Sequence, residues 1–286
     1  MRLSPVCRVS LTFVCVAALF ACVALADNAP PFAGTKAGQV RDDNGVKTKL
    51  VWIPPGEFTM GSPEDEKDRY KDENQVHVTL TKGFWLGQHE VTQAEWQRLM
   101  QTTPWSGKER VKEGDDYPAT CVSWDDAIKF CEKLTEQERT AGRLPADWQY
   151  TLPTEAQWEY ACRGGSKSRF SFGDDESDLV NYAWFTRNAD DAHEEYAHLV
   201  GQKKANPWGL SDMQGNVWEW CKDYYAEKLV GGTDPQGPSQ GSTRVERGGC
   251  WRGTAEFCRS AARYRITPDT RINSVGFRVA AVPAGK

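Results

Sequence analysis

The sequence predicts a single-domain α+β fold with many loops. Short segments rich in β-branched and aromatic residues come first, three amphipathic helices with capping signals follow, and a long series of turn residues separated by short apolar pieces comes last. The 286 residues are 39% hydrophobic and 26% charged, which excludes a disordered tail, a collagen-like repeat and a coiled coil. We therefore expect an ordinary globular protein with a packed core.

Residues 1–26 have the organisation of a signal peptide. Arg2 and Arg8 supply a basic start, residues 11–25 form an apolar stretch, and residues 24–26 (Ala-Leu-Ala) form a small-x-small cleavage site. No later stretch approaches the roughly 18 apolar residues that a membrane span needs. We therefore expect an exported protein, periplasmic or extracellular, with no transmembrane span in the mature chain. A loose lipobox ending at Cys22 leaves lipoprotein anchoring as the alternative.

Residues 27–47 are short on apolar side chains and contain Pro30-Pro31. This composition predicts a flexible leader. Residues 48–283 contain no Pro/Gly/Ser linker, charge run or internal repeat that would divide them, so we predict one domain there. The balance of 35 Lys+Arg against 40 Asp+Glu is acidic, which argues against binding to nucleic acid.

Four early segments have the composition of strands, because β-branched and aromatic side chains pack well on a pleated surface. They are residues 50–53, 56–60, 76–80 and 84–86. Three helices are predicted by capping boxes, in which a Ser or Thr precedes an acid or amide by three residues. These pairs are Thr92 with Glu95, Ser123 with Asp126, and Thr154 with Gln157. Gly164-Gly165 is typical of the end of the third helix.

Six cysteines lie outside the signal peptide, at positions 121, 131, 162, 221, 250 and 258. An even number fits disulfide formation in an oxidising compartment. Their spacing matches no zinc pattern.

Seven segments occur in the order found in one family. They read Val-Trp-Ile-Pro-Pro-Gly-Glu-Phe-Thr-Met-Gly-Ser at 51–62, Glu-Val-Thr at 90–92, Val-Ser-Trp-Asp-Asp-Ala at 122–127, Leu-Pro-Thr-Glu-Ala-Gln-Trp-Glu-Tyr at 152–160, Gly-Asn-Val-Trp-Glu-Trp at 215–220, Arg-Gly-Gly at 247–249 and Gly-Phe-Arg at 276–278. Over about residues 48–283 the chain thus resembles the sulfatase-modifying factor, or formylglycine-generating enzyme, family.

The resemblance implies a loop-rich variant of the C-type-lectin-like fold that is stabilised by bound calcium. The name-giving members oxidise a cysteine within a sulfatase to formylglycine, using molecular oxygen and a copper(I) ion held by two cysteines. Two thiolates suit Cu(I) because both partners are soft. The implied partner is an exported protein or peptide, with a sulfatase as the family's substrate.

The family's copper-binding Cys-x4-Cys pair is missing from this chain. In the enzymes it lies between Gly-Gly-Ser and Ala-Ala-Arg, a stretch that here is about three residues shorter. Alignment from either side puts Gly253 and Ala255 at the two cysteine positions, which argues against the oxygen-dependent reaction and favours a pseudoenzyme. Cys250, at the place of the family's serine, and Cys258 remain candidates for a rearranged copper site; the alternative is a structural disulfide or buried thiols.

The resemblance also implies the other site residues. One calcium is expected on Asp212 and Glu219 side chains and on the carbonyls of Gly215 and Val217, since Ca²⁺ takes oxygen ligands, main-chain carbonyls among them. A second calcium is expected at Asn181 and Tyr182. The implied substrate-binding residues are Trp218, Arg263 and Ser274, the last standing where the enzymes carry an asparagine. The preferred disulfide joins Cys162 with Cys258, and a weaker prediction joins Cys121 with Cys250.

Residues 244–278 hold eight Arg, no Lys and three acidic residues. Such a patch would receive sulfate, carboxylate or an acidic peptide, because guanidinium groups bind planar oxyanions in pairs of hydrogen bonds; the alternative is pairing with carboxylates of the same chain. Two functions follow from the sequence. One is an exported family member with an altered active site, and the other is a non-catalytic lectin-like module that binds a peptide or a sulfated glycan.

Overall fold

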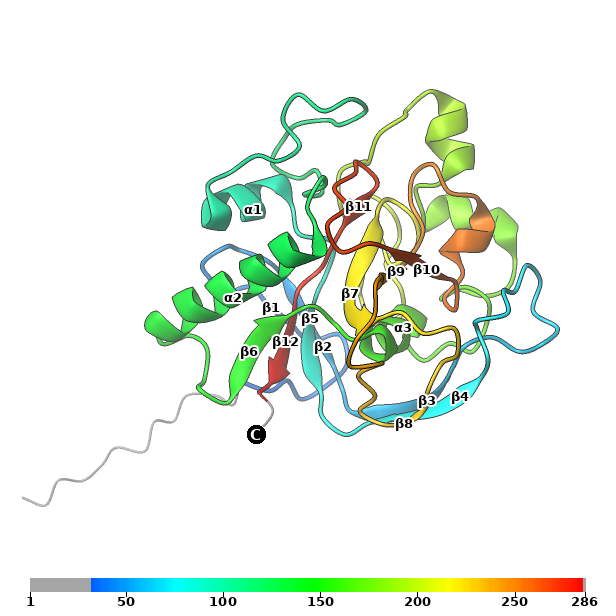
Figure 1. Ribbon diagram of the computed structural model, residues 1–286, viewed down its shortest axis with the longest axis horizontal. Coiled ribbons are helices and arrows are strands. Elements are labelled where there is room, and N and C mark those ends of the chain that lie inside the picture. The colour runs from blue at the N-terminus through cyan, green and yellow to red at the C-terminus, as the bar shows by residue number, and fades with distance from the viewer. Residues whose placement is uncertain (1–31, 285–286) are drawn as a thin grey trace, which may run out of the picture. The chain divides into compact units, whose positions relative to one another are not determined.

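A computed structural model describes residues 32–284 and contains three β-sheets (Figure 1). The strands are β1 (Val40–Arg41), β2 (Leu50–Ile53), β3 (Gly56–Met60), β4 (Val76–Leu80), β5 (Phe84–Gly87), β6 (Trp148–Thr151), β7 (Trp218–Tyr224), β8 (Gly232–Thr233), β9 (Arg244–Arg247), β10 (Arg263–Ile266), β11 (Val275–Gly276) and β12 (Ala280–Pro283). The helices are α1 (Gln93–Met100), α2 (Trp124–Thr140) and α3 (Glu155–Arg163), with 3₁₀ turns η1 (Glu176–Asn181), η2 (Thr186–Asn188), η3 (Asp190–Ala192) and η4 (Ala255–Cys258).

The four strands predicted in the first part of the chain are present as β2 to β5. Every residue of β2 and β5 is buried, which explains their unbroken apolar composition. These two strands pair in antiparallel fashion and form the middle of a five-stranded sheet of order β1-β2-β5-β12-β6. The prediction of an α+β fold with many loops is confirmed.

Each of the three predicted helices begins at its capping box. Thr92, Ser123 and Thr154 accept a hydrogen bond from the backbone N–H three residues later, and the side chain at that position returns a bond to the cap. Helix α3 ends at Gly164, whose φ of 54° is left-handed, as expected for a C-terminal glycine. The caps satisfy backbone groups that the first turn of a helix leaves unpaired.

Residues 32–47 are part of the folded domain, which corrects the prediction of a flexible leader there. Strand β1 pairs with β2, and Val46 is buried in the core. The Trp85 Nε1–H donates to the Phe32 carbonyl at 2.8 Å. The segment carries few apolar side chains, but it covers the edge of the first sheet. The predicted signal peptide, with Cys22, lies outside the described residues.

The turn-rich second half of the chain builds the sheet that positions the site. Its order is β10-β9-β7-β11, with β10 at one edge. The last strand, β12, then returns to the first sheet and pairs with both β5 and β6. The fully buried side chains of the core include Trp158 of α3, Trp220 of β7 and Trp251, which follows β9. Among residues 32–284, no helix is both long and apolar enough to span a bilayer.

Candidate functional site

The loop before β7 brings acidic side chains into the interior. Asp212 and Asn216 have left-handed backbone conformations, with φ of 56° and 59°. Between them Gly215 has a φ of 81°, and a Cβ there would stand 2.2 Å from the Trp184 carbonyl oxygen. Only glycine fits this turn. The turn places Asp212 at its start and Glu219 in β7, and both carboxylates are buried.

A third carboxylate joins them from a distant part of the chain. Glu90, just before α1, accepts a hydrogen bond at Oε1 from Asn216 Nδ2 at 3.0 Å. Burial, and then the charges of Asp212 and Glu219, raise the pKa of Glu90 well above its ordinary value. Burial raises the pKa of Asp212 to about 6. Sequence reasoning missed Glu90, for which the only signal was its place in the family motif at 90–92.

We call Glu90, Asp212 and Glu219 the acidic cluster. Arg278 faces it: its Nε donates to Glu219 Oε2 at 2.7 Å, and Trp158 Nε1 donates to the same oxygen at 2.7 Å. Glu90 Oε2 and Asp212 Oδ1, in contrast, are buried without a hydrogen-bond partner. One guanidinium therefore leaves two carboxylate oxygens unsatisfied, and such oxygens are the ligands that Ca²⁺ prefers.

The four residues implied as ligands of one calcium thus lie on or beside a single turn, at positions 212, 215, 217 and 219. Glu219 is turned toward Arg278 and Trp158. Within residues 32–284, no group of three or more His, Cys, Asp or Glu side chains is arranged to hold a metal ion by itself. A cation at this turn would therefore need main-chain carbonyls as well as carboxylates.

The second implied calcium site lies at the end of η1. The Asn181 carbonyl accepts a hydrogen bond from the Lys204 N–H at 2.9 Å, and the Tyr182 ring stacks on Phe172 with centroids 4.1 Å apart. The Lys203 ammonium donates to the neighbouring Val180 carbonyl at 2.8 Å. A positive side chain next to these residues opposes the binding of a cation, and this site stays a prediction.

The candidate copper ligands are buried thiols. All six cysteines among the described residues are free, so neither the Cys162–Cys258 bridge nor the Cys121–Cys250 bridge is formed. The Cys162 and Cys258 thiols instead point to main-chain carbonyls, 3.8 and 4.0 Å away. Burial raises the pKa of Cys250, and burial together with the neighbouring Cys250 and Cys162 raises that of Cys258. Raised pKa values disfavour the thiolate that would bind copper.

Gly253 and Ala255, which the resemblance implies stand at the two copper-ligand positions, lie in a tight turn. The Gly253 N–H donates to the Cys250 carbonyl at 2.8 Å, and Ala255 begins η4. Ser274 is also occupied within the chain, since its hydroxyl accepts from Arg252 at 3.0 Å and its carbonyl accepts from the Trp218 N–H at 2.9 Å.

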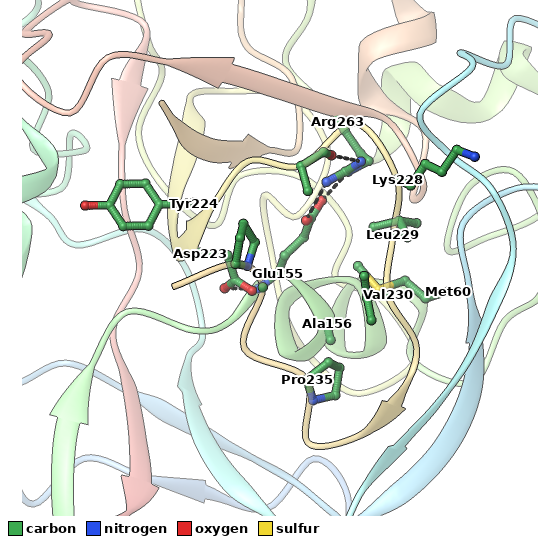
Figure 2. A pocket seen from close by; sticks show the side chains of 13 residues that line it. Met60, Glu155, Ala156, Asp223, Tyr224, Lys228, Leu229, Val230, Pro235 and Arg263 are labelled. Carbon is green, nitrogen blue, oxygen red and sulfur yellow. Dashed lines mark hydrogen bonds and ion pairs between the residues drawn. The ribbon is translucent and has the colours of Figure 1, made fainter. Parts of the chain in front are cut away.

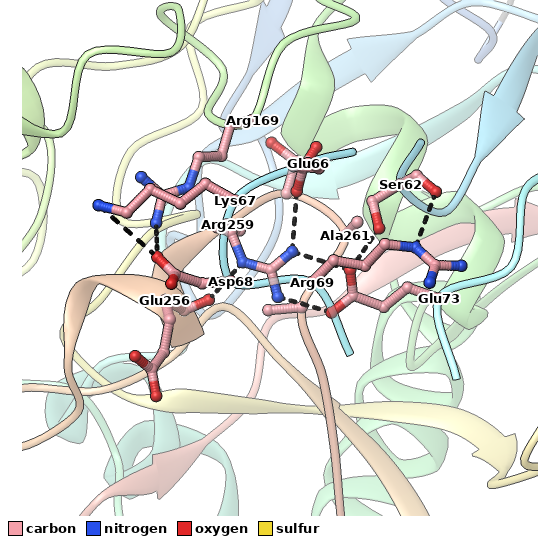
Figure 3. A network of polar contacts seen from close by, with 12 residues as sticks. Ser62, Glu66, Lys67, Asp68, Arg69, Glu73, Arg169, Glu256, Arg259 and Ala261 are labelled. Carbon is pink, nitrogen blue, oxygen red and sulfur yellow. Dashed lines mark hydrogen bonds and ion pairs between the residues drawn. The ribbon is translucent and has the colours of Figure 1, made fainter. Parts of the chain in front are cut away.

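Half of the arginines in residues 244–278 are neutralised inside the protein. Arg247, Arg259, Arg263 and Arg278 are buried and paired with buried glutamates. Figure 3 shows the network around Arg259, whose guanidinium binds Glu73 and Glu66. Internal pairing therefore explains much of the arginine-rich stretch.

Arg263, implied as a substrate-binding residue, holds parts of the structure together. Its Nε and one terminal nitrogen donate to the two Glu155 oxygens at 2.6 and 2.9 Å (Figure 2). The other terminal nitrogen donates to the carbonyls of Asp72 and Ala226 at 2.8 and 3.0 Å. These bonds use four of its five N–H groups.

A groove of about 1000 Å³ runs beside β10, and we call it the β10 groove. It is lined by Phe257 and by residues from segments 69–72, 225–228 and 263–265. Tyr70 and Tyr264 are 37% and 46% exposed there. Trp218 stacks under Tyr264 with ring centroids 5.2 Å apart. Arg263 thus lines the groove as a buried residue of β10. Trp218 lies beneath the groove and supports the ring of Tyr264.

A family model and a relative of known name both place the chain in the same family. The family described as "Sulfatase-modifying factor enzyme 1-like domain" matches residues 36–282. The formylglycine-generating enzyme of Mus musculus is 29% identical, over 82% of this chain and 75% of its own length.

Two solved structures resemble the whole described domain. Treponema denticola variable protein 1 is 31% identical with a TM-score of 0.72, covering 85% of this chain and 98% of its own. PvdO from Pseudomonas aeruginosa is 29% identical with a TM-score of 0.75, covering 87% and 99%.

Proposed function

Because the chain belongs to the sulfatase-modifying factor family and has the C-type-lectin-like fold of its formylglycine-generating members, we propose that it binds polypeptide segments in the β10 groove without oxidising them. One observation carries this proposal. The two cysteines of the loop at 250–258 are buried, with exposures of 2% and 0%, and neither lines the groove.

The residues present do not fit a copper(I) centre. Copper needs two thiolates that an incoming cysteine can approach. Here Gly253 and Ala255 offer no sulfur, while Cys250 and Cys258 are thiols with raised pKa values beneath the surface. We therefore derive no oxidation step for this chain.

The β10 groove has the features of a peptide-binding site. Its volume reaches the upper end of the usual range for ligand sites. Exposed Tyr70 and Tyr264 offer apolar area with few rotatable bonds, a property shared by rigid binding surfaces. Their rings are held by Phe257 and Trp218, so little side-chain freedom is lost on binding.

The groove is separate from the element that we expect to bind calcium. The acidic cluster fits a calcium ion because Asp212 Oδ1 and Glu90 Oε2 are buried and unpartnered. Asp212, Glu219 and the carbonyls of Gly215 and Val217 would hold the ion, with Glu90 nearby. When bound, calcium supplies positive charge that balances the buried carboxylates and holds the turn before β7.

We also propose that the protein is exported. The sequence of residues 1–26 supports a signal peptide, and a partner outside the cytoplasm, such as a sulfatase, is the family's implied ligand. Sequencing the amino terminus of secreted protein should give a chain that begins at Asp27. A chain that begins at a lipid-modified Cys22 would favour membrane anchoring instead.

The deciding experiment tests whether the protein catalyses the family's oxidation of a peptide cysteine to formylglycine. Purified protein, copper(I), oxygen and a Cys-x-Pro-x-Arg peptide are incubated, and the peptide mass is followed, with the mouse formylglycine-generating enzyme as the positive control. We expect no formylglycine, while the folded protein retains peptide in equilibrium dialysis. Conversion of the peptide cysteine to formylglycine would overturn the proposal.

A further inference from the structure

The β10 groove follows the edge of a β-sheet. Arg263, Tyr264 and Arg265 are consecutive in β10, and all three line the groove. Successive side chains of a strand point to opposite faces of the sheet. A groove lined by three in a row therefore runs along the strand's edge and reaches around it to both faces.

This edge has no partner strand among the described residues. In the sheet order β10-β9-β7-β11, β10 pairs only with β9. Alternate residues of an edge strand direct their N–H and C=O groups outward, where an extended chain can pair with them. Both Tyr264 and Arg265 are exposed, so this edge is open to solvent.

The two faces of the edge differ in chemistry. On one face Tyr264 packs with Phe257, with centroids 6.4 Å apart, and Phe257 stacks on Tyr70. On the other face the Arg265 guanidinium lies over Tyr225, 4.2 Å from the ring centroid. In an extended chain beside β10, every second side chain would contact the aromatic wall formed by Tyr70, Phe257 and Tyr264. The remaining side chains would lie on the basic face, at Arg265.

The charge of the groove favours an acidic ligand. Lys71, Lys228 and Arg265 line it, and none forms an ion pair within residues 32–284. Glu227 is the one exposed acid in the lining. A positive groove on a chain with a net charge of -5 attracts anions locally.

We propose that the β10 groove takes up an acidic polypeptide segment in extended conformation, which adds to the edge of β10 as a further strand. This inference rests on the proposed peptide-binding function and names its mode and ligand chemistry. Main-chain hydrogen bonds to β10 give affinity, as in other sheet-edge recognition. The ligand's carboxylates face Arg265, Lys228 and Lys71, and its apolar side chains face Tyr70 and Tyr264.

The test begins with a random-sequence display library of ten-residue peptides, selected against the full mature protein. We expect enrichment of peptides in which Asp or Glu alternates with apolar residues. The most enriched peptide is then synthesised with a fluorophore, and its dissociation constant is measured by anisotropy. Replacing its acids by Gln and Asn should weaken binding about tenfold, and the loss should shrink at high salt.

Strand addition is tested by methylating backbone nitrogens of the peptide. In one version the odd residues carry N-methyl groups and in the other the even residues do. We expect one version to bind about tenfold more weakly, through loss of the hydrogen bonds to β10, and the other to bind nearly as well as the parent, because an edge pairs with alternate residues only.

Variants locate the site. Arg265→Glu and Lys228→Glu should weaken the acidic peptide, whereas Arg271→Gln, outside the groove, should not; circular dichroism melts check that each variant folds. Equal binding of both N-methylated versions, or selection of neutral peptides, would overturn this inference and leave peptide binding intact. A library without any enriched peptide would overturn the proposed function itself.

Discussion

The buried side chain of Glu246 contributes to a pH dependence of the protein's stability. It lies in β9 with 1% exposure, and its Oε1 has no hydrogen-bond partner. Burial raises its pKa to about 8. Below the unfolded pKa of about 4.5 the carboxyl is protonated in both states. As the pH rises, ionisation favours the unfolded chain, and the stabilising contribution is lost by about pH 8.

We predict that Glu246→Gln removes this residue's contribution to the pH dependence. The free energy of unfolding of the variant should equal that of the wild type near pH 4 and exceed it by up to about 5 kcal/mol near pH 9, since each unit of pKa shift is worth about 1.4 kcal/mol. Urea unfolding at a series of pH values measures the difference. Glu132→Gln, at an exposed position of α2, serves as the control. A difference that does not change with pH would contradict the assignment.

Two glycines with nearly the same backbone conformation separate the effect of φ from the effect of crowding. Gly215 and Gly209 have φ of 81° and 83°. A Cβ at Gly215 would collide with the Trp184 carbonyl, whereas no atom lies within 4 Å of one at Gly209. Gly209→Ala should cost about 1 kcal/mol through backbone strain alone. Gly215→Ala should cost about 1–3 kcal/mol more, because the turn must move. Equal losses in urea unfolding would contradict this.

At the scale of the elements, local sequence signals are sufficient to predict where helices begin. They are not sufficient to predict which strands pair over long distances in the sequence. Thr92, Ser123 and Thr154 were predicted as helix starts because a capping box needs only four consecutive residues. The position of β12 between β5 and β6 could not be predicted, since its partners lie more than a hundred residues away. The few apolar side chains of residues 32–47 predict a leader, whereas in the structure β1 of this segment pairs along a sheet edge.

The candidate site divides in the same way. The resemblance implies a site at 212–219 because the motif that carries it is contiguous in the sequence. Glu90 was missed, since only the folded chain brings it to Asn216. The aromatic wall of the β10 groove was missed for the same reason, because Tyr70 and Phe257 come from distant segments.

Arg263 links β10 to α3 and to two loops, and we predict a structural role that can be measured. It ties β10 to Glu155 at the start of α3 and to the carbonyls of Asp72 and Ala226. Arg263→Met should cost about 3–5 kcal/mol in the free energy of unfolding, because the buried Glu155 carboxylate loses both of its hydrogen bonds from Arg263 and keeps only the Arg247 guanidinium, 3.6 Å away. The double variant with Glu155→Gln should lose less than Arg263→Met alone, since no unpaired charge remains. Additive losses in the double-mutant cycle would indicate that the pair is not coupled.

At the scale of the whole molecule, the family relation establishes the fold and leaves the chemistry to individual side chains. The chain keeps the scaffold of proteins that oxidise cysteine, with the turn before β7 and the Arg278–Glu219 pair in place. In our proposal Gly253 and Ala255 stand at the places of the family's two copper ligands, and the nearby thiols of Cys250 and Cys258 are buried. We propose that the buried polar framework of this scaffold serves binding instead of catalysis.

That framework gives the last prediction, which concerns the stability of the entire domain. If a calcium ion balances the acidic cluster, a ligand that binds only the folded state raises the melting temperature. EDTA should lower the melting temperature of wild-type protein, and added calcium should restore it. Asp212→Asn should melt at the same temperature with and without EDTA, because it removes the unpartnered carboxylate, whereas Glu246→Gln should keep the response. If EDTA does not change the melting temperature of the wild-type protein, Arg278 alone balances the negative charge of the acidic cluster.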